Sequence, residues 1–182
     1  MQKASKIILT VALCGIITGI PNDPAAPAPP TEYEIKAAFL YKFASFVEWP
    51  NKSFSSSNSP IVIGVLGQDP FGSVLDRTIE GKTIDGRRFA VKRAAESADL
   101  KTCHILFISS SERTSIKKIL SDVKGASVLT VGDVEGLVER GVIINFNVAN
   151  NKVGFEINVN AAKRAGLKIS SKLLKLASRT IN

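Results

Sequence analysis

The stretch Ile61-Val62-Ile63-Gly64-Val65-Leu66, followed directly by Gly67-Gln68-Asp69-Pro70-Phe71-Gly72, decides the fold of this chain. Its first half is an almost unbroken apolar run, which is typical of a β-strand buried on both faces. Such strands occur in sheets that carry helices on either side. Its second half predicts a strand-to-helix turn, with Asp69 as the N-cap and Pro70 as the first helical residue. The N-terminus of that helix is a place where a small anion could bind.

Strand and helix patterns alternate further along the chain. Apolar runs predict three more strands, at residues 89–91, 104–108 and 128–131. A short helix up to Arg140 is expected after the last of them. Alternation of this kind is typical of a sheet whose strands pair in parallel.

One of the connecting helices has a clear start signal. Ser109 and Glu112 have the spacing of a capping box. The apolar residues that follow recur at helical spacing and predict a core face made of Ile116, Ile119, Leu120 and Val123.

From Gly141 onward the apolar period changes to two. Apolar residues alternate with polar ones in residues 144–148 and again in residues 153–157, on either side of Asn150-Asn151. This pattern predicts an antiparallel hairpin. With Asn150-Asn151 as the turn, Asn145 faces Glu156 and both lie on one polar face.

Helices are expected near both ends of the predicted domain. Residues 32–46 have helical spacing and predict one buried face, made of Ile35, Ala38, Phe39, Phe43 and Phe46. Near the C-terminus, a short helix stops at Gly166 and another begins after Ser170. The sequence therefore predicts one three-layer α/β domain over residues 31–182, with a mainly parallel or mixed sheet flanked by helices and a late antiparallel hairpin.

Residues 1–30 are expected to be a signal peptide and a Pro/Ala linker. Lys3 and Lys6 precede an apolar run over residues 7–20, which is shorter than the roughly 20 residues of a membrane span and has the length of a signal-peptide core. Cys14 leaves a lipoprotein open as the alternative. Because Leu13 stands where a lipoprotein signal has Gly or Ala, cleavage without a stable membrane anchor is the preferred interpretation.

The composition limits the possible partners. The formal net charge is +8, which often indicates nucleic acid or an anionic surface. Export and the lack of aromatic residues among the basic ones argue against nucleic acid.

No residue set predicts catalysis, a metal or a cofactor. The only histidine, His104, is next to Cys103, the only thiol outside the leader. Neighbours on a strand point to opposite faces, so the pair is poorly placed to form a thiolate-imidazole nucleophile. We expect Cys103 to be buried, and we expect no metal site because the usual ligand set is absent.

Two polar groups are candidates for binding. On the hairpin, the candidate ligand contacts are Asn145, Asn147, Glu156 and Asn158, with a solvated sheet face as the alternative. Toward the C-terminus, four basic residues at helical spacing predict a stripe that contacts an acidic partner, with a solvated helix face as the alternative. These are Lys168, Lys172, Lys175 and Arg179.

Several stretches together resemble the YfiR-like, or HmsC-like, proteins. The resemblance begins with residues 33–43 (YEIKAAFLYKF) and 46–50 (FVEWP) and runs in order over the whole predicted domain. The further matching stretches are residues 63–67 (IGVLG), 69–72 (DPFG), 103–108 (CHILFI), 128–133 (VLTVGD), 155–158 (FEIN), 161–162 (AA) and 165–177 (AGLKISSKLLKLA).

This resemblance implies a periplasmic α/β protein that forms a homodimer and is not an enzyme. It would repress an inner-membrane diguanylate cyclase by binding the periplasmic sensor region of that enzyme, and so restrain cyclic di-GMP signalling and biofilm formation. Some relatives use disulfides for redox control, which Cys103 alone does not reproduce. The second hypothesis is a periplasmic receptor for a small ligand, a nucleotide or an amino acid, bound at the Asp69-Pro70 helix start or on the Asn145/Glu156 face.

Overall fold

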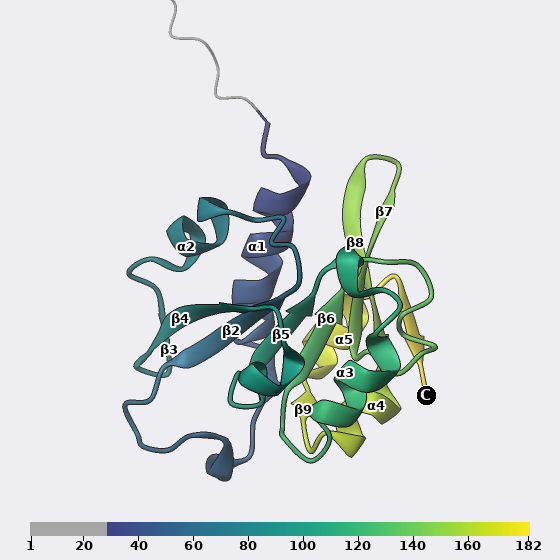
Figure 1. Cartoon of the computed structure of the whole chain (residues 1–182). Helices are drawn as coiled ribbons and strands as arrows, with labels where there is room; N and C mark the ends of the chain where they lie inside the picture. The colour runs from purple at the N-terminus through teal and green to yellow at the C-terminus, as the bar shows by residue number, and fades with distance from the viewer. Residues whose placement is uncertain (1–28) are drawn as a thin grey trace, which may run out of the picture.

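The strand predicted at residues 61–66 is β2 (Ile61–Leu66), which lies between β4 (Arg87–Ala94) and β5 (Ile105–Ile108) and is parallel to both (Figure 1). This architecture comes from a computed structural model that describes residues 29–182. The predicted leader, including Cys14, lies outside the described residues, which begin at the end of the linker.

The sheet has eight strands in the order β10-β8-β7-β6-β5-β2-β4-β3. From β4 to β7 the neighbouring strands are parallel, whereas β7 with β8 and β3 with β4 are antiparallel, and β10 is parallel to β8. The predicted mixed sheet with a late hairpin is therefore confirmed. The remaining strands are β3 (Thr83–Ile84), β6 (Leu129–Gly132), β7 (Ile144–Ala149), β8 (Lys152–Asn158) and β10 (Arg179–Ile181).

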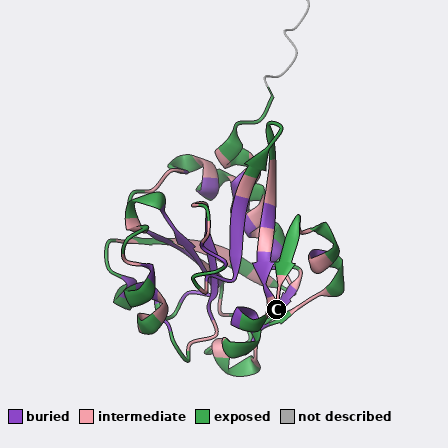
Figure 2. Ribbon diagram, turned by 90° about the vertical axis from the view of Figure 1, so that its right-hand side faces the viewer, coloured by how far each residue is buried: buried purple, intermediate pink, exposed green. Residues whose placement is uncertain are grey.

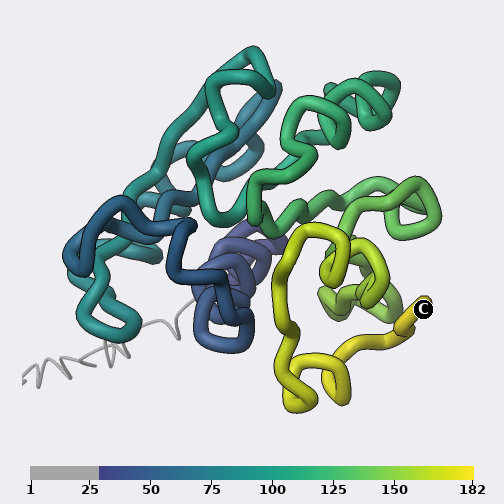
Figure 3. The backbone as a smooth tube through the Cα atoms, turned by 90° about the horizontal axis from the view of Figure 1, so that it is seen from below, coloured from purple at the N-terminus to yellow at the C-terminus, as the bar shows by residue number. Residues whose placement is uncertain are grey.

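Each face of the sheet has its own layer of helices. Side chains of β5 alternate between two apolar clusters, with Ile105 and Phe107 in one and Leu106 and Ile108 in the other. The first cluster includes residues of α1 (Glu32–Phe43), α2 (Ser73–Ile79), α4 (Val159–Arg164) and α5 (Ser171–Leu176). The second includes residues of α3 (Ile116–Asp122) and the short helix η2 (Ser97–Leu100). Figure 3 shows α3 in green and the C-terminal segment in yellow on opposite sides of the molecule.

The hairpin of β7 and β8 has the predicted register. Asn145 pairs with Glu156, and both Asn150 and Asn151 at the turn have positive φ angles, of 50° and 58°. This left-handed backbone matches the twist of a two-residue hairpin. Buried residues lie along the central strands and the hairpin tip is exposed (Figure 2).

A second, small sheet was not predicted. It pairs β1 (Val47–Glu48) with β9 (Lys168–Ile169) in antiparallel fashion. The backbone N–H of Ser170 also donates to the carbonyl of Phe46 at 2.9 Å. The chain leaving α1 is therefore tied to the C-terminal segment.

Helix α1 is shorter than predicted and its buried face is different. It ends at Phe43, and its buried residues are Lys36, Ala37, Leu40 and Phe43. Of the predicted face, only Phe43 is fully buried, whereas Ala38 is exposed. Apolar side chains surround much of this helix, so their spacing alone selected the wrong face, and a buried lysine is rare enough to be missed.

One other predicted helix start and one predicted short helix are wrong. The Ser109 hydroxyl caps a short 3-10 helix, η3 (Ser110–Glu112), by accepting from the N–H of Ser111, and α3 begins only at Ile116. The residues between Asp133 and Arg140 form turns instead of a short helix. At the first place the Ser109 side chain forms a local turn, which competes with helix formation. At the second place Gly136 has a φ of 79°, which a right-handed helix cannot contain. A further 3-10 helix, η1 (Asn51–Ser53), precedes the Ser-rich loop before β2.

Within residues 29–182, none of the helices combines the length and the apolar character needed to cross a membrane.

Candidate functional site

A cavity of about 620 Å³ collects most of the predicted ligand residues. Asn145, Asn147 and Glu156 line it together with Arg179 of the predicted basic group. We call it the hairpin cavity. Its lining consists of Glu32, Lys36, Asp133, Glu135, Gly136, Glu139, Asn145, Phe146, Asn147, Val148, Glu156 and Arg179.

The strand register places these side chains side by side. Gly132, the last residue of β6, is the register partner of Asn145 on β7, which in turn faces Glu156 on β8. Asp133 follows Gly132 at the carboxyl end of β6. A Cβ at position 132 would overlap with Cδ1 of Leu137, so the glycine makes room for that leucine. Carboxyl ends of parallel strands are the usual place for ligand sites in α/β sheets.

Helix α1 contributes a buried charged cluster to the cavity. Lys36 is only 3% exposed, and its Nζ lies 2.9 Å from Asp133 Oδ2 and 2.6 Å from Glu32 Oε1. The Tyr33 hydroxyl donates to the same Asp133 oxygen at 3.0 Å. The Lys36 ammonium also lies 4.6 Å from the centre of the Tyr33 ring. Buried charges need such partners, because water is not available to solvate them.

Tyr33 stays protonated at all physiological pH values. Burial raises the pKa of its hydroxyl to about 12, and the negative charge of Asp133 adds to the rise. The hydroxyl is therefore a permanent donor to Asp133. The Tyr33 ring also makes an edge contact with Phe71, at 5.4 Å between ring centres, which fixes the N-terminal turn of α1 against the turn after β2.

Arg179 of β10 also lines the cavity. Its Nε and Nη2 donate to Glu156 Oε1 and Oε2, each at 2.9 Å, and Nη2 also donates to Glu139. The hydrogen bond from Arg179 holds the pKa of Glu139 below its ordinary value. Both cations of the cavity, Lys36 and Arg179, are thus already paired with carboxylates.

Two oxygens at the cavity lack a hydrogen-bond donor. Asp133 is bound through Oδ2, but its Oδ1 has no partner, and neither has Oδ1 of Asn145. Both residues are almost fully buried: the side chain of Asp133 is 4% exposed and Asn145 is 2% exposed. An unsatisfied buried acceptor costs about 1–3 kcal/mol, so two of them at one cavity call for an explanation.

The fourth predicted ligand residue, Asn158, lies apart from the cavity. Its Oδ1 accepts from the N–H of Ala161 at 2.7 Å, and its Nδ2 donates to the carbonyl of Val138 at 2.7 Å. Asn158 is the N-cap of α4 and ties that helix to the turns after β6.

The prediction that the four basic residues form a stripe on one helix face is wrong. Helix α5 contains only Lys172 and Lys175, because Lys168 lies on β9 and Arg179 on β10. The chain leaves the helical conformation at Ala177, where ψ is 138°. Lys168 faces Glu48 across the small sheet at 3.7 Å, whereas Lys172 and Lys175 remain exposed beside Leu176, which is 65% exposed.

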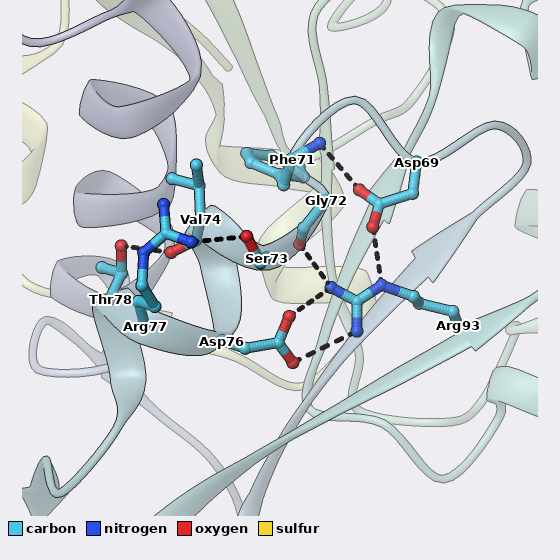
Figure 4. Close-up of polar contacts among 9 residues, drawn as sticks. All are labelled: Asp69, Phe71, Gly72, Ser73, Val74, Asp76, Arg77, Thr78 and Arg93. Atoms are coloured by element: carbon cyan, nitrogen blue, oxygen red, sulfur yellow. Dashed lines mark hydrogen bonds and ion pairs between the residues drawn. The ribbon is translucent and has the colours of Figure 1, made fainter.

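The turn after β2 is filled by a side chain from β4 (Figure 4). Arg93 Nε lies 2.6 Å from Asp69 Oδ2, and its Nη2 lies 2.6 Å from Asp76 Oδ2 and 2.8 Å from the carbonyl oxygen of Gly72. Asp69 also accepts from the N–H of Phe71 at 2.8 Å.

The predicted roles of Asp69 and Pro70 are therefore wrong. Asp69 caps the turn at Phe71, and α2 begins only at Ser73, after Gly72 takes a φ of 52°. The carboxylates of Asp69 and Asp76 also disfavour the small anion that this turn was expected to attract.

The Cys103 side chain is buried in the core, and the His104 side chain is hydrogen-bonded to the backbone. Burial raises the pKa of the Cys103 thiol to about 12, so the thiol stays protonated. His104 Nδ1 accepts from the N–H of Val62 at 3.1 Å, and Nε2 lies 3.1 Å from the carbonyl of Ser53, to which it donates in that tautomer. In the described part of the chain, no three His, Cys, Asp or Glu side chains come together as a metal site requires.

Sequence reasoning missed Tyr33, Lys36 and Asp133. One signal was available for Asp133, since it directly follows a buried strand and therefore lies at the carboxyl edge of the sheet. Tyr33 and Lys36 are three residues apart and share a helix face. The sequence does not show that this face is turned toward Asp133.

The sequence model of one family, described as YfiR/HmsC-like, matches residues 33–178 of the chain. Among solved structures, a conserved domain protein from Vibrio cholerae O1 biovar El Tor str. N16961 is similar, with a TM-score of 0.57 and 15% identity over 82% of this chain and 60% of that chain. This chain therefore spans 60% of the length of the Vibrio protein, and the likeness concerns the fold alone. The ABC domain in complex with L-Trp from Streptococcus pneumonia aligns with a TM-score of 0.48 and 11% identity, over 66% of this chain and 55% of that chain.

Proposed function

The chain belongs to the YfiR/HmsC-like family, whose members are periplasmic regulators of diguanylate cyclases, and from this membership we propose that it represses an inner-membrane diguanylate cyclase. It does so by binding the periplasmic sensor region of that enzyme. Repression lowers the level of cyclic di-GMP and thereby restrains biofilm formation.

One observation carries this proposal. The family match extends over residues 33–178, which is nearly all of the described chain, and it includes both the α1 segment and the C-terminal α5 segment. The match therefore supports a function of the whole domain and not of a fragment of it.

The environments of Cys103 and His104 support a function that works by protein contact and not by catalysis. The Cys103 thiol is buried and protonated, and both ring nitrogens of His104 are within hydrogen-bond distance of backbone groups. A nucleophile or a general base needs the opposite, a group whose reactive atom is free to meet a substrate.

We propose that the exposed face of α5 takes part in the contact with the cyclase. Lys172, Lys175 and Leu176 are all exposed there. Basic residues around an exposed leucine suit an acidic partner surface that has an apolar centre. Arg179 is less available because it is bound to Glu139 and Glu156.

The location and the assembly of the protein are part of the same proposal. We propose that residues 1–30 direct export and are then removed, which delivers the domain to the periplasm without a membrane anchor. We also propose that the domain forms a homodimer, a state that sedimentation analysis of the purified protein tests.

Capture from membrane extract tests the contact itself. The protein purified from cells expressing the full chain serves as bait, and mass spectrometry should identify a diguanylate cyclase with a periplasmic region among the bound proteins. Lys172→Glu combined with Lys175→Glu should weaken capture, because the charge is reversed on α5. Lys117→Glu on α3, an exposed lysine on the other side of the sheet, is the matched control and should leave capture unchanged. Equal capture by all three baits contradicts the proposed surface.

A second function, binding of a small ligand, is favoured by the unpartnered oxygens of the hairpin cavity. The carboxylates that line the cavity disfavour the phosphates of a nucleotide.

A further inference from the structure

We propose that the hairpin cavity binds a small organic cation that carries primary ammonium groups, such as a linear diamine or polyamine. This site does not depend on the proposed regulatory role, because it is inferred only from groups within the cavity.

The first observation is the pair of acceptors without donors. Oδ1 of Asp133 and Oδ1 of Asn145 are buried and unpartnered, and both residues line the cavity. The two residues are neighbours in space, because Asn145 pairs with Gly132, the residue before Asp133. Each of these two oxygens therefore lacks one donor. An ammonium group supplies three donors and no acceptor.

The second observation is the charge of the lining. Glu32, Asp133, Glu135, Glu139 and Glu156 contribute five carboxylates, whereas Lys36 and Arg179 contribute two cations. The cavity is thus acidic, although the chain as a whole has a net charge of +8. A concave site lined by one sign of charge concentrates ligands of the opposite sign.

An organic cation fits these groups better than a metal ion does. Among the described residues, no three acidic, histidine or cysteine side chains converge as metal ligands. The side chains of Phe146 and Val148 give the cavity an apolar part, against which a methylene chain packs. At about 620 Å³, the cavity is in the range of small-molecule sites.

Isothermal titration calorimetry with cadaverine and spermidine tests the site, with 1,5-pentanediol as a neutral analogue of cadaverine. The protein is purified from cells expressing the full chain. Saturable binding of one of the two amines, and none of the diol, is the expected result. Absence of binding by both amines at millimolar concentration, or equal binding of the diol, overturns the proposal.

Three variants distinguish the site from general attraction to an acidic surface. Asn145→Leu removes an unpartnered acceptor without leaving another polar group buried, so it should fold and should lower affinity by roughly tenfold. Glu139→Gln should lower affinity through lost charge. Glu96→Gln, an exposed carboxylate that does not line the cavity, should leave affinity unchanged. If all three variants bind as the wild type does, or if Glu96→Gln weakens binding as much as Glu139→Gln does, the cavity is not the site.

Discussion

At the scale of single residues, the buried pair of Lys36 and Asp133 links α1 to the end of β6. With side chains only 4% exposed, both charges depend on each other and on the Tyr33 hydroxyl. Such a pair contributes little net stability but makes the loss of one partner costly, because the other charge is left buried.

We predict that Lys36→Met destabilises the protein by about 3 kcal/mol, because Asp133 keeps only the Tyr33 hydroxyl as a donor. Adding Asp133→Leu should recover most of this loss, since no charge then remains buried. Lys42→Met, an exposed position on the same helix, should change stability by less than about 0.5 kcal/mol. Urea unfolding measures all three values. A double variant no more stable than Lys36→Met would contradict this account of the pair.

A second residue-scale prediction concerns pH. Burial lowers the pKa of His104 below its ordinary value, and the nearby Arg87 charge acts in the same direction. The unfolded chain therefore takes up the proton more readily than the folded chain does. Stability should be complete above neutral pH and should fall as the pH drops below about 6.5, the pKa of histidine in the unfolded chain.

Urea unfolding at pH 7.5 and pH 5.5 tests the role of His104. Protonation of Nδ1 would break its hydrogen bond with the N–H of Val62, so the wild type should be less stable at the lower pH. His104→Gln does not titrate in this range and should lose less stability between the two values. An equal loss in both proteins would assign the pH dependence to other groups.

At the scale of secondary-structure elements, the sequence correctly predicted the strands and turns that have a local pattern of apolar or turn residues. The strand at residues 61–66 and the hairpin register follow from apolar runs and from the Asn150-Asn151 turn, and both are confirmed. The strands β1, β9 and β10 are two or three residues long, so they have no period of their own. They form only because distant segments meet, which local periodicity does not show.

The same distinction applies to the candidate site. The sequence correctly predicted that Asn145 faces Glu156, because the Asn150-Asn151 turn fixes which residues of the two strands pair. The approach of Lys36 to Asp133 joins residues 97 positions apart. That contact depends on how α1 crosses the sheet, which no local pattern indicates.

The hairpin turn offers a test at this scale. Asn151 has a φ of 58°, a conformation that glycine adopts without strain and β-branched residues resist. Asn151→Gly should therefore leave the free energy of unfolding unchanged or raise it by a few tenths of a kcal/mol, and Asn151→Val should lower it by about 1–2 kcal/mol. Chemical denaturation compares the two variants. A valine variant as stable as the glycine variant would show that the turn adopts another backbone conformation.

At the scale of the whole molecule, the described domain separates two kinds of surface. The hairpin cavity is acidic and lies at the carboxyl end of β6, whereas the exposed lysines of α5 belong to the C-terminal segment. The proposed contact with a cyclase and the proposed binding of a small cation therefore involve different surfaces. The capture and calorimetry experiments address these surfaces separately.

The central claim is repression of a cyclase from outside the cytoplasm, and the cellular level of cyclic di-GMP tests it most directly. Deletion of the gene should raise this level and increase surface attachment. Expression of residues 31–182 behind a working signal peptide should reverse both effects, and expression of the same residues without a signal should not. The account is contradicted if deletion leaves cyclic di-GMP unchanged in a strain that retains its periplasmic-sensor cyclases, or if the leaderless form restores the level equally well.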